Sequence, residues 1–238
     1  MDKMHLHIKN NRAGEEVFSM SPERVAAALT RRPDIAERLD VTVDWDTDNF
    51  TASMAQAEGL LTWNLPKENL SRVAPKLKWI HIIGAGVEHL QPLDWLPRGV
   101  TLVNNRGVHA AKVADYGVMA ILMLNNRMPA YYEAQRNRRF DPQFATPVTG
   151  KTLAVIGVGE MGGAVARAAK RFGLHVIGVR RGGRKTRSVH EMFGPESLDA
   201  VLVRADFVLI TTPLTPETRN LIDRRRLDLM KPTAGLIN

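Results

Sequence analysis

Three glycines at fixed spacing mark a segment whose backbone could hold a phosphate. The apolar run Thr152–Ile156 leads into Gly157-x-Gly159-x-x-Gly162, and small residues typical of a helix follow. In such a unit the first glycine permits the tight turn and the second lets backbone approach a pyrophosphate. The third lets helix and strand pack closely. The helix start, at Glu160 and Met161, would direct the N–H groups of its first turn and the positive end of the helix dipole at the phosphates.

The context of these glycines decides between two interpretations. Glycine-rich turns between a strand and a helix are common, and a purely structural turn is one alternative. Here a strand precedes the glycines, a helix follows, and a second apolar run at 174–179 closes a βαβ unit. This context favours a dinucleotide-binding site.

The residue at the end of the second strand indicates which dinucleotide would bind. A carboxylate that holds the ribose 2′-hydroxyl of NAD is expected about 20 residues beyond the motif. Arg180 and Arg181 stand there instead, and the first carboxylate is Glu191. A carboxylate would repel a 2′-phosphate, whereas a guanidinium pairs with it through two parallel hydrogen bonds. A solvated basic loop is the alternative, but the position of Arg180 favours NADP(H) over NAD(H).

The elements that must position these residues alternate along the chain. Strands alternating with helices predict mostly parallel sheets covered on both faces. Ser21 and Pro22 form a strong helix start, an N-cap followed by proline at the first helical position. In the first half we predict strands at 4–8, 41–45, 60–63 and 79–83, and further helices near 51–58 and 69–74.

The second half begins with a long helical pattern over 110–138, with a break at 125–129, and a turn-rich linker at 141–150. Beyond the glycine unit we predict helices at 196–204 and after the cap Asp223, and strands at 206–210 and 234–237. The second sheet then has four strands. We therefore divide the chain into a substrate domain (1–109), a connecting helix and linker (110–149), and an incomplete dinucleotide-binding domain (150–238).

Composition limits the classes of protein. The 238 residues include no cysteine, which excludes disulfides, thiol nucleophiles and cysteine-ligated metals. No apolar run is long enough to cross a membrane, and the N-terminus lacks the plan of a signal peptide. We expect a cytoplasmic protein with no membrane partner and no metal.

The net charge of +8 raises nucleic-acid binding as an alternative. Aromatic residues are only 6% and none interleaves with the basic runs, as a base-stacking platform would need. Small anionic ligands explain the charge as well, so we expect no nucleic-acid partner.

With these motifs placed, the chain resembles the D-isomer-specific 2-hydroxyacid dehydrogenases, and four segments carry the likeness. The glycine motif is one. The segment 83–90 is similar to the loop whose backbone holds the substrate carboxylate, which implies roles for Ala85 and Gly86. The segment 113–115 resembles the family's Val-Ala-Glu, with Asp115 replacing the glutamate, and implies a cofactor contact at Val113. The segment 211–221 is similar to the signature Pro-Leu-Thr-x-x-Thr beside the cofactor, and implies Thr212, Pro213 and Thr218.

The resemblance implies a fold, an activity and an assembly. The fold would be α/β, with a flavodoxin-like substrate domain followed by an incomplete Rossmann domain. The activity would be NADPH-dependent reduction of a small 2-oxoacid, of the glyoxylate or hydroxypyruvate type, to the D-2-hydroxyacid. With an arginine at position 180, the chain departs from the NAD-using majority of the family and resembles the NADP-using glyoxylate/hydroxypyruvate reductases. The family also implies a homodimer through the nucleotide domain and the long helix.

The C-terminal end departs from the family pattern. In the family, the strand that matches 235–238 is followed by an arginine, a glutamate and a histidine that do the catalysis, and Asn238 precedes all three. We therefore expect a truncated chain with no catalytic residue of its own, which does not reduce glyoxylate or hydroxypyruvate. His89, His109 and Arg127 would be the first substitutes to consider. The alternative is a non-catalytic, dinucleotide-sensing or interaction protein on the same fold.

Overall fold

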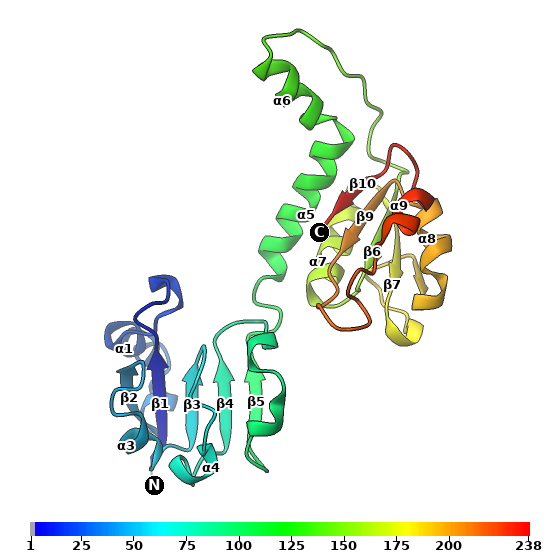
Figure 1. Cartoon of the computed structure of the whole chain (residues 1–238). Coiled ribbons are helices and arrows are strands. Elements are labelled where there is room, and N and C mark those ends of the chain that lie inside the picture. The colour runs from blue at the N-terminus through cyan, green and yellow to red at the C-terminus, as the bar shows by residue number, and fades with distance from the viewer. Residues whose placement is uncertain (1–2) are drawn as a thin grey trace. The chain divides into compact units, whose positions relative to one another are not determined.

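The protein consists of two compact units. The computed structural model describes residues 3–238, and the chain divides into Met1–Arg106 and Gly107–Asn238 (Figure 1). Each unit is built on a five-stranded sheet whose strand pairs are all parallel. The α/β class expected from the alternation of strands and helices is confirmed.

The sheet of the first unit has the flavodoxin-like order β2-β1-β3-β4-β5. Its strands are β1 (Met4–Asn10), β2 (Leu39–Trp45), β3 (Gly59–Thr62), β4 (Trp79–Ile82) and β5 (Thr101–Asn104). The sequence interpretation omitted β5, because four residues of alternating exposure at a sheet edge give little hydrophobic signal.

Short helices connect these strands. Ser21 caps α1 as expected, since its hydroxyl accepts a hydrogen bond from the Arg24 N–H at 3.4 Å and Pro22 begins the helix. The predicted helix at 51–58 is shorter and starts one residue earlier. The helices are α1 (Pro22–Thr30), α2 (Pro33–Ala36), α3 (Phe50–Met54) and α4 (Leu70–Val73), with 3-10 turns η1 (Glu16–Phe18), η2 (Glu88–Leu90) and η3 (Leu93–Trp95).

The core of the first unit lies between its sheet and the helices α3 and α4. Met54, Leu60, Ile80 and Ile82 are fully buried there, together with Leu70. Burial of such aliphatic side chains stabilises a fold by about 1.5–3 kcal/mol each. The strand β1 adds the buried polar residues His7, Lys9 and Asn10, and the last two line the cavity described below.

The second unit has the Rossmann order, with β8-β7-β6-β9-β10 equivalent to 3-2-1-4-5. Its strands are β6 (Thr152–Ile156), β7 (His175–Val179), β8 (Glu191–Phe193), β9 (Phe207–Ile210) and β10 (Gly235–Ile237). The prediction of four strands is wrong, because β8 was not recognised. That strand has three half-buried residues and begins with a glutamate, so neither length nor periodicity marks it.

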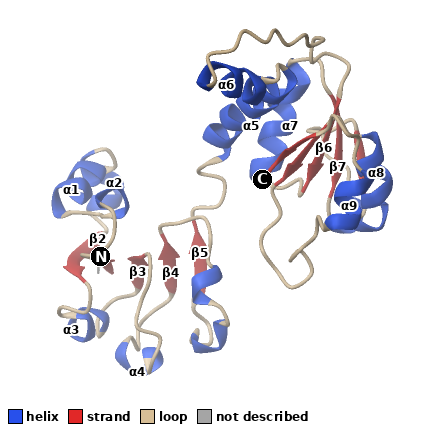
Figure 2. Ribbon diagram, turned by 45° about the horizontal axis from the view of Figure 1, so that its top comes forward, coloured by secondary structure: helices blue, strands red, loops and turns tan. Residues whose placement is uncertain are grey.

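Helices cover both faces of this sheet (Figure 2). Leu153 and Val155 face α5 and α7, where Ile121 and Val165 are buried. Their neighbours along β6 face the opposite way, into a cluster with α8. The helices are α5 (Ala110–Asn125), α6 (Met128–Arg136), α7 (Glu160–Arg171), α8 (Leu198–Arg204) and α9 (Arg224–Leu229), with 3-10 turns η4 (Arg181–Gly183) and η5 (Pro195–Ser197).

The long helical segment is broken where expected. Arg127 adopts a left-handed conformation, with φ of 53°, and Pro129 lies in the first turn of α6. Upstream, Gly117 lets α5 pack closely on α7, since a β-carbon there would lie 2.7 Å from Val165 Cγ1. Within residues 3–238, no helix is long and apolar enough to span a membrane.

An ion-pair cluster holds β8 to its neighbours. The Glu191 carboxylate accepts hydrogen bonds from the Arg204 guanidinium at 2.5 and 3.1 Å, and lies 2.7 Å from His175 Nε2. These two partners lower the pKa of Glu191 to about 2, chiefly through the bonds from Arg204. His175 begins β7, so the cluster lies at the amino ends of the strands.

Replacing Glu191 by glutamine tests this cluster. The folded-state pKa of about 2 lies below the ordinary value of 4.5, so its stabilising effect is present above pH 4.5 and lost as the pH falls toward 2. The group is half-exposed and screened, so we expect Glu191→Gln to lower the melting temperature at pH 7 by only about 2–4 °C. Calorimetry should show the deficit shrinking between pH 4.5 and 2, with Glu37→Gln as control. An equal deficit at pH 7 and pH 2.5 would show that the effect is not electrostatic.

Candidate functional site

The glycine turn lies where the second sheet reverses its strand order. The turn follows β6, and its neighbour across the reversal is the segment after β9. In doubly wound sheets, ligands bind at this reversal, outside the carboxyl ends of the strands. Gly157 has φ of +99°, and a β-carbon there would lie 2.8 Å from the Thr212 nitrogen. Only glycine fits at this position.

The other two glycines have the roles that the spacing predicts. At Gly162 a β-carbon would lie 2.5 Å from Thr211 Oγ1 and still closer to the Gly157 carbonyl oxygen, so the start of α7 packs directly on the turn. A β-carbon at Gly159 would meet nothing within 4 Å beyond its own chain neighbours, so this residue borders open space. The structure thus leaves room at Gly159 for the backbone approach that a pyrophosphate requires.

The start of α7 provides hydrogen-bond donors at this open space. Gly159 is the N-cap, and the intrahelical bonds begin with the Gly163 N–H donating to the Gly159 carbonyl at 2.9 Å. The N–H groups of Glu160, Met161 and Gly162 therefore belong to the first turn, which has no intrahelical acceptors. Such donors, with the helix dipole, form an anion-binding end.

Arg180 is held at the carboxyl end of β7. Its N–H donates to the Phe193 carbonyl at 3.1 Å, and its own carbonyl accepts from Gly183 at 3.1 Å. The turn that follows needs glycines, with φ of +72° at Gly182 and +56° at Gly183. Arg180 is half-buried and Arg181 is exposed. Because β6 and β7 are parallel neighbours, these residues follow β7 at the same edge of the sheet where the glycine turn follows β6.

The segment after β9 is tied to the turn and internally braced. Thr211 Oγ1 donates to the Gly157 carbonyl at 2.6 Å. Thr218 Oγ1 accepts from the Thr215 N–H at 2.8 Å and donates to the Pro213 carbonyl at 2.5 Å. Thr218 therefore shapes the segment, and the contacts with cofactor that the resemblance implies for Thr218, Thr212 and Pro213 stay predictions.

The positive charge of Arg181 acts on Glu217, which belongs to this segment. The pKa of Glu217 is lowered, first by a hydrogen bond with Thr215, and Arg181 contributes to the shift. The parallel pairing of β6 with both β7 and β9 places the arginines after β7 and the segment after β9 on the same edge. Val113, another residue that the resemblance implies, belongs to α5 and packs against the core of this unit. Its contact with the cofactor stays a prediction.

In the first unit, Ala85 and Gly86 lie in the loop after β4. The Gly84 carbonyl accepts from the Asn105 N–H at 3.0 Å, and the Ala85 carbonyl accepts from Asn104 Nδ2 at 2.6 Å. In a trans peptide the next residue's N–H points the opposite way. The N–H groups of Ala85 and Gly86 therefore point away from β5, as a pair that could hold a carboxylate.

Trp63 packs over this loop. A β-carbon at Gly84 would clash with the Trp63 ring, so glycine lets the indole approach the backbone. His89 stacks on the same ring at 4.3 Å between centroids, and its Nε2 lies 2.8 Å from the Trp63 carbonyl, which can only accept. These contacts make His89 a packing partner of Trp63. His109, the N-cap residue of α5, is exposed and makes no side-chain cap bond.

Sequence reasoning missed a cavity at the carboxyl ends of the strands of this unit. Its lining includes Lys9, Asn10, Phe18 and Trp63. A lysine and an asparagine at consecutive buried positions of a strand were the available signal, because charged residues are rarely buried. In residues 3–238 no group of three or more histidine or acidic side chains could hold a metal ion.

The second unit is thus a Rossmann-type dinucleotide-binding unit by its strand order and glycine turn. The sequence profile of "D-isomer specific 2-hydroxyacid dehydrogenase, NAD binding domain" matches residues 118–238. The chain belongs to this family of oxidoreductases, as the resemblance indicated.

Individual relatives agree. A glyoxylate reductase of Thermococcus litoralis is 32% identical over 190 residues, which cover 75% of this chain and 56% of that protein. A D-3-phosphoglycerate dehydrogenase of Mycobacterium tuberculosis is 29% identical over 206 residues, 83% of this chain and 39% of that protein. The chain therefore spans about 40–55% of these curated relatives.

A solved structure has the same fold. It is an NADPH-dependent glyoxylate/hydroxypyruvate reductase of Sinorhizobium meliloti in complex with NADP and sulfate. Its TM-score is 0.73 at 26% identity, and the match covers 96% of this chain and 68% of that one.

Two adjacent glycines of α7 provide a matched test of the packing. Gly162→Ala puts a β-carbon against backbone and should lower the free energy of unfolding by about 1–3 kcal/mol. Gly163→Ala meets nothing nearer than 3.4 Å, the flexible end of Arg167, and should be neutral or stabilising by up to about 1 kcal/mol. Urea unfolding measures both. Equal stability of the two variants would contradict the close approach at Gly162.

Proposed function

We propose that this chain provides the NADPH site and the carboxylate-binding loop of a 2-oxoacid reductase of the glyoxylate/hydroxypyruvate type. Arg180 carries the proposal for NADP, because it stands at the strand end where the adenosine ribose of a Rossmann-bound dinucleotide lies. The NADP in the Sinorhizobium meliloti structure supports the same choice. The family includes enzymes named for different substrates, phosphoglycerate and glyoxylate, so the substrate type is part of the proposal.

The residues present fit a dinucleotide. Gly159 borders open space, Gly157 and Gly162 accept no side chain, and the first turn of α7 offers donors for the pyrophosphate. Arg180 and Arg181 would pair with the 2′-phosphate. When bound, the reduced nicotinamide supplies a hydride to the carbonyl carbon of the substrate.

The first unit would bind and orient the substrate. The N–H groups of Ala85 and Gly86 would donate to its carboxylate, which fixes the carbonyl group nearby. Protonation of the carbonyl oxygen needs an acid. His89 is not arranged for it, since its ring stacks on Trp63 and its Nε2 is bonded to the Trp63 carbonyl. The binding and positioning steps are the ones that we assign to residues 3–238.

We also propose that the protein acts in the cytoplasm, as its cysteine-free composition supports, and that it binds neither nucleic acid nor membranes.

Comparative titration tests the cofactor. We expect NADPH to bind at least tenfold tighter than NADH, because a charge-assisted bidentate pair contributes about 1.5–3 kcal/mol. Arg180→Asp should weaken the binding of NADPH at least tenfold and leave the binding of NADH unchanged or make it tighter. Arg98→Asp, in an exposed loop of the first unit, is the control. Equal affinity of the unmodified protein for the two dinucleotides would refute the NADP assignment.

We further propose a homodimer through α5 and α6. Tyr116 and Met119 lie one turn apart on α5 and are 57% and 47% exposed, and Tyr132 of α6 is 50% exposed. Exposed apolar groups of this kind mark protein interfaces. Sedimentation velocity should give a dimer for the unmodified chain and a monomer for Tyr116→Glu combined with Met119→Lys. Leu227→Lys, on α9, should stay dimeric. A monomeric unmodified chain would contradict the proposal.

A further inference from the structure

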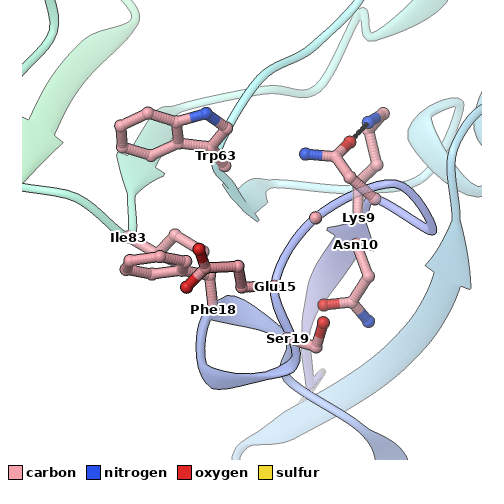
Figure 3. A pocket seen from close by; sticks show the side chains of 9 residues that line it. Lys9, Asn10, Glu15, Phe18, Ser19, Trp63 and Ile83 are labelled. Carbon is pink, nitrogen blue, oxygen red and sulfur yellow. Dashed lines mark hydrogen bonds between the residues drawn. The ribbon is translucent and has the colours of Figure 1, made fainter.

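A cavity of about 260 Å³ lies at the carboxyl ends of the first unit's strands (Figure 3). It is bordered by Asn10 and the loop that follows β1, by Trp63 after β3, and by Ile83 after β4. The strand order reverses between β1 and β3, which is where ligands bind in sheets of the flavodoxin order. The cavity therefore occupies the ligand position of this unit's fold.

The two sides of the cavity differ in chemistry. Trp63, Phe18 and Ile83 form an apolar side, and Lys9 and Asn10 lie across from them (Figure 3). Asn10 is used by the fold, because its amide bonds both the carbonyl and the N–H of Met20, at 3.1 and 2.8 Å. The charge at this side comes from Lys9.

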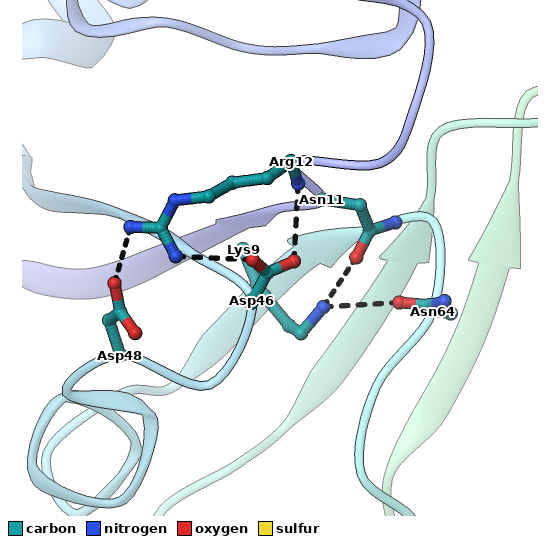
Figure 4. Close-up of polar contacts among 6 residues, drawn as sticks. All are labelled: Lys9, Asn11, Arg12, Asp46, Asp48 and Asn64. Atoms are coloured by element: carbon teal, nitrogen blue, oxygen red, sulfur yellow. Dashed lines mark hydrogen bonds and ion pairs between the residues drawn. The ribbon is translucent and has the colours of Figure 1, made fainter.

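Lys9 is a buried cation bonded to neutral groups. It is 5% exposed, and its Nζ donates to Asn11 Oδ1 at 2.7 Å and to Asn64 Oδ1 at 3.1 Å (Figure 4). An ammonium group has three N–H donors, and these bonds use two. Burial lowers the pKa of Lys9, against a smaller opposite effect of Asp46.

The carboxylate that could neutralise Lys9 is engaged elsewhere. Asp46 accepts from the Arg12 N–H and from the Arg12 guanidinium, both at 3.1 Å, and Asp48 accepts from the same guanidinium at 2.5 Å (Figure 4). Among residues 3–238, no ion pair of Lys9 within 4.0 Å is present. Buried charges are normally paired, so this arrangement leaves a place for an external anion.

The neighbouring polar groups favour an anion as well. Asn11 also lines the cavity, and because its oxygen faces Lys9, its NH₂ group is a further donor on this side. Glu15 lines the cavity too, but it is exposed, so its charge is screened by water. Its repulsion of an anion is therefore weaker than the attraction of the desolvated Lys9.

We propose that this cavity binds a second, distal carboxylate, which extends the substrates of the proposed reductase from glyoxylate and hydroxypyruvate to dicarboxylic 2-oxoacids. The inference rests on the proposed function, in which the N–H groups of Ala85 and Gly86 hold the first carboxylate. Two contacts join the sites: Ile83 directly precedes that loop and lines the cavity, and Trp63 lines the cavity and packs on Gly84. The apolar side would contact the methylene groups, and Lys9 with Asn11 would bind the distal carboxylate.

Two acids of equal length test the proposal, since 2-oxovalerate and 2-oxoglutarate differ only by a terminal methyl or carboxylate group. Each is titrated into the full 238-residue chain while the Trp63 indole N–H resonance, assigned with Trp63→Phe, is followed by NMR. We expect 2-oxoglutarate to bind at least tenfold tighter than 2-oxovalerate. Lys9→Met should reduce this preference to within twofold, and Lys76→Met, which removes an exposed lysine, should leave it unchanged.

A second variant avoids dependence on the folding of Lys9→Met. Asn11→Asp gives Lys9 a counter-ion within the protein and should also remove the preference. Glu15→Gln should leave 2-oxoglutarate binding unchanged or tighter, whereas weaker binding would contradict an anion site. The proposal is overturned if 2-oxovalerate binds as tightly as 2-oxoglutarate, if neither binds, or if the preference survives in both Lys9→Met and Asn11→Asp. NADPH binding by the same samples reports separately on the proposed cofactor function.

Discussion

The second unit depends on one steric constraint. The turn after β6, the start of α7 and the segment Thr211–Thr212 after β9 approach so closely that no β-carbon fits at Gly157 or Gly162. The hydroxyl of Thr211 closes the contact by donating to the Gly157 carbonyl. This packing fixes the direction of α7 relative to the sheet, and with it the direction of the N–H groups of the first helical turn. The open space beside Gly159 is therefore a product of tight packing on both sides of it.

Parallel sheets explain where the polar groups of both units are found. Their strands are buried on both faces, so polar side chains concentrate at the strand ends. Lys9 lies at the end of β1 and Arg180 directly after β7, as this rule predicts. The surroundings of the two side chains differ. Arg180 is half-buried and leads into a turn with two positive-φ glycines, whereas Lys9 is enclosed and bonded to amide oxygens. The first suits a large charged ligand at a surface, and the second suits a small one in a cavity.

The sequence predicted features that depend on local chemistry. The glycines, the cap at Ser21, the break near Arg127 and the position of Arg180 follow from backbone geometry and spacing over short distances, and the structure agrees with each. Strand β5 was missed because its residues alternate between exposed and half-buried, and β8 because its residues are only half-buried and begin with a glutamate, whereas the equally short β3 and β4 contain buried residues. Strand β8 is fastened by Arg204 and His175 from elsewhere in the chain. The cavity was missed for a different reason, since the ends of β1, β3 and β4 each contribute to it and no single segment describes it.

The ion pair of Arg12 and Asp46 influences how much positive charge Lys9 presents in the cavity of the first unit. Asp46, the carboxylate whose charge acts on Lys9, is held by Arg12, and Lys9 bonds amide oxygens instead. The charge available inside the cavity is thus set by a surface arginine that is not part of its wall. Exchange of that exposed side chain would remove the guanidinium from Asp46 Oδ2 and leave only the backbone N–H of residue 12 on Oδ1, so that Asp46 could counter the charge of Lys9 more strongly. Evolution could in this way alter which substrates are accepted through a position where substitutions cost little folding stability.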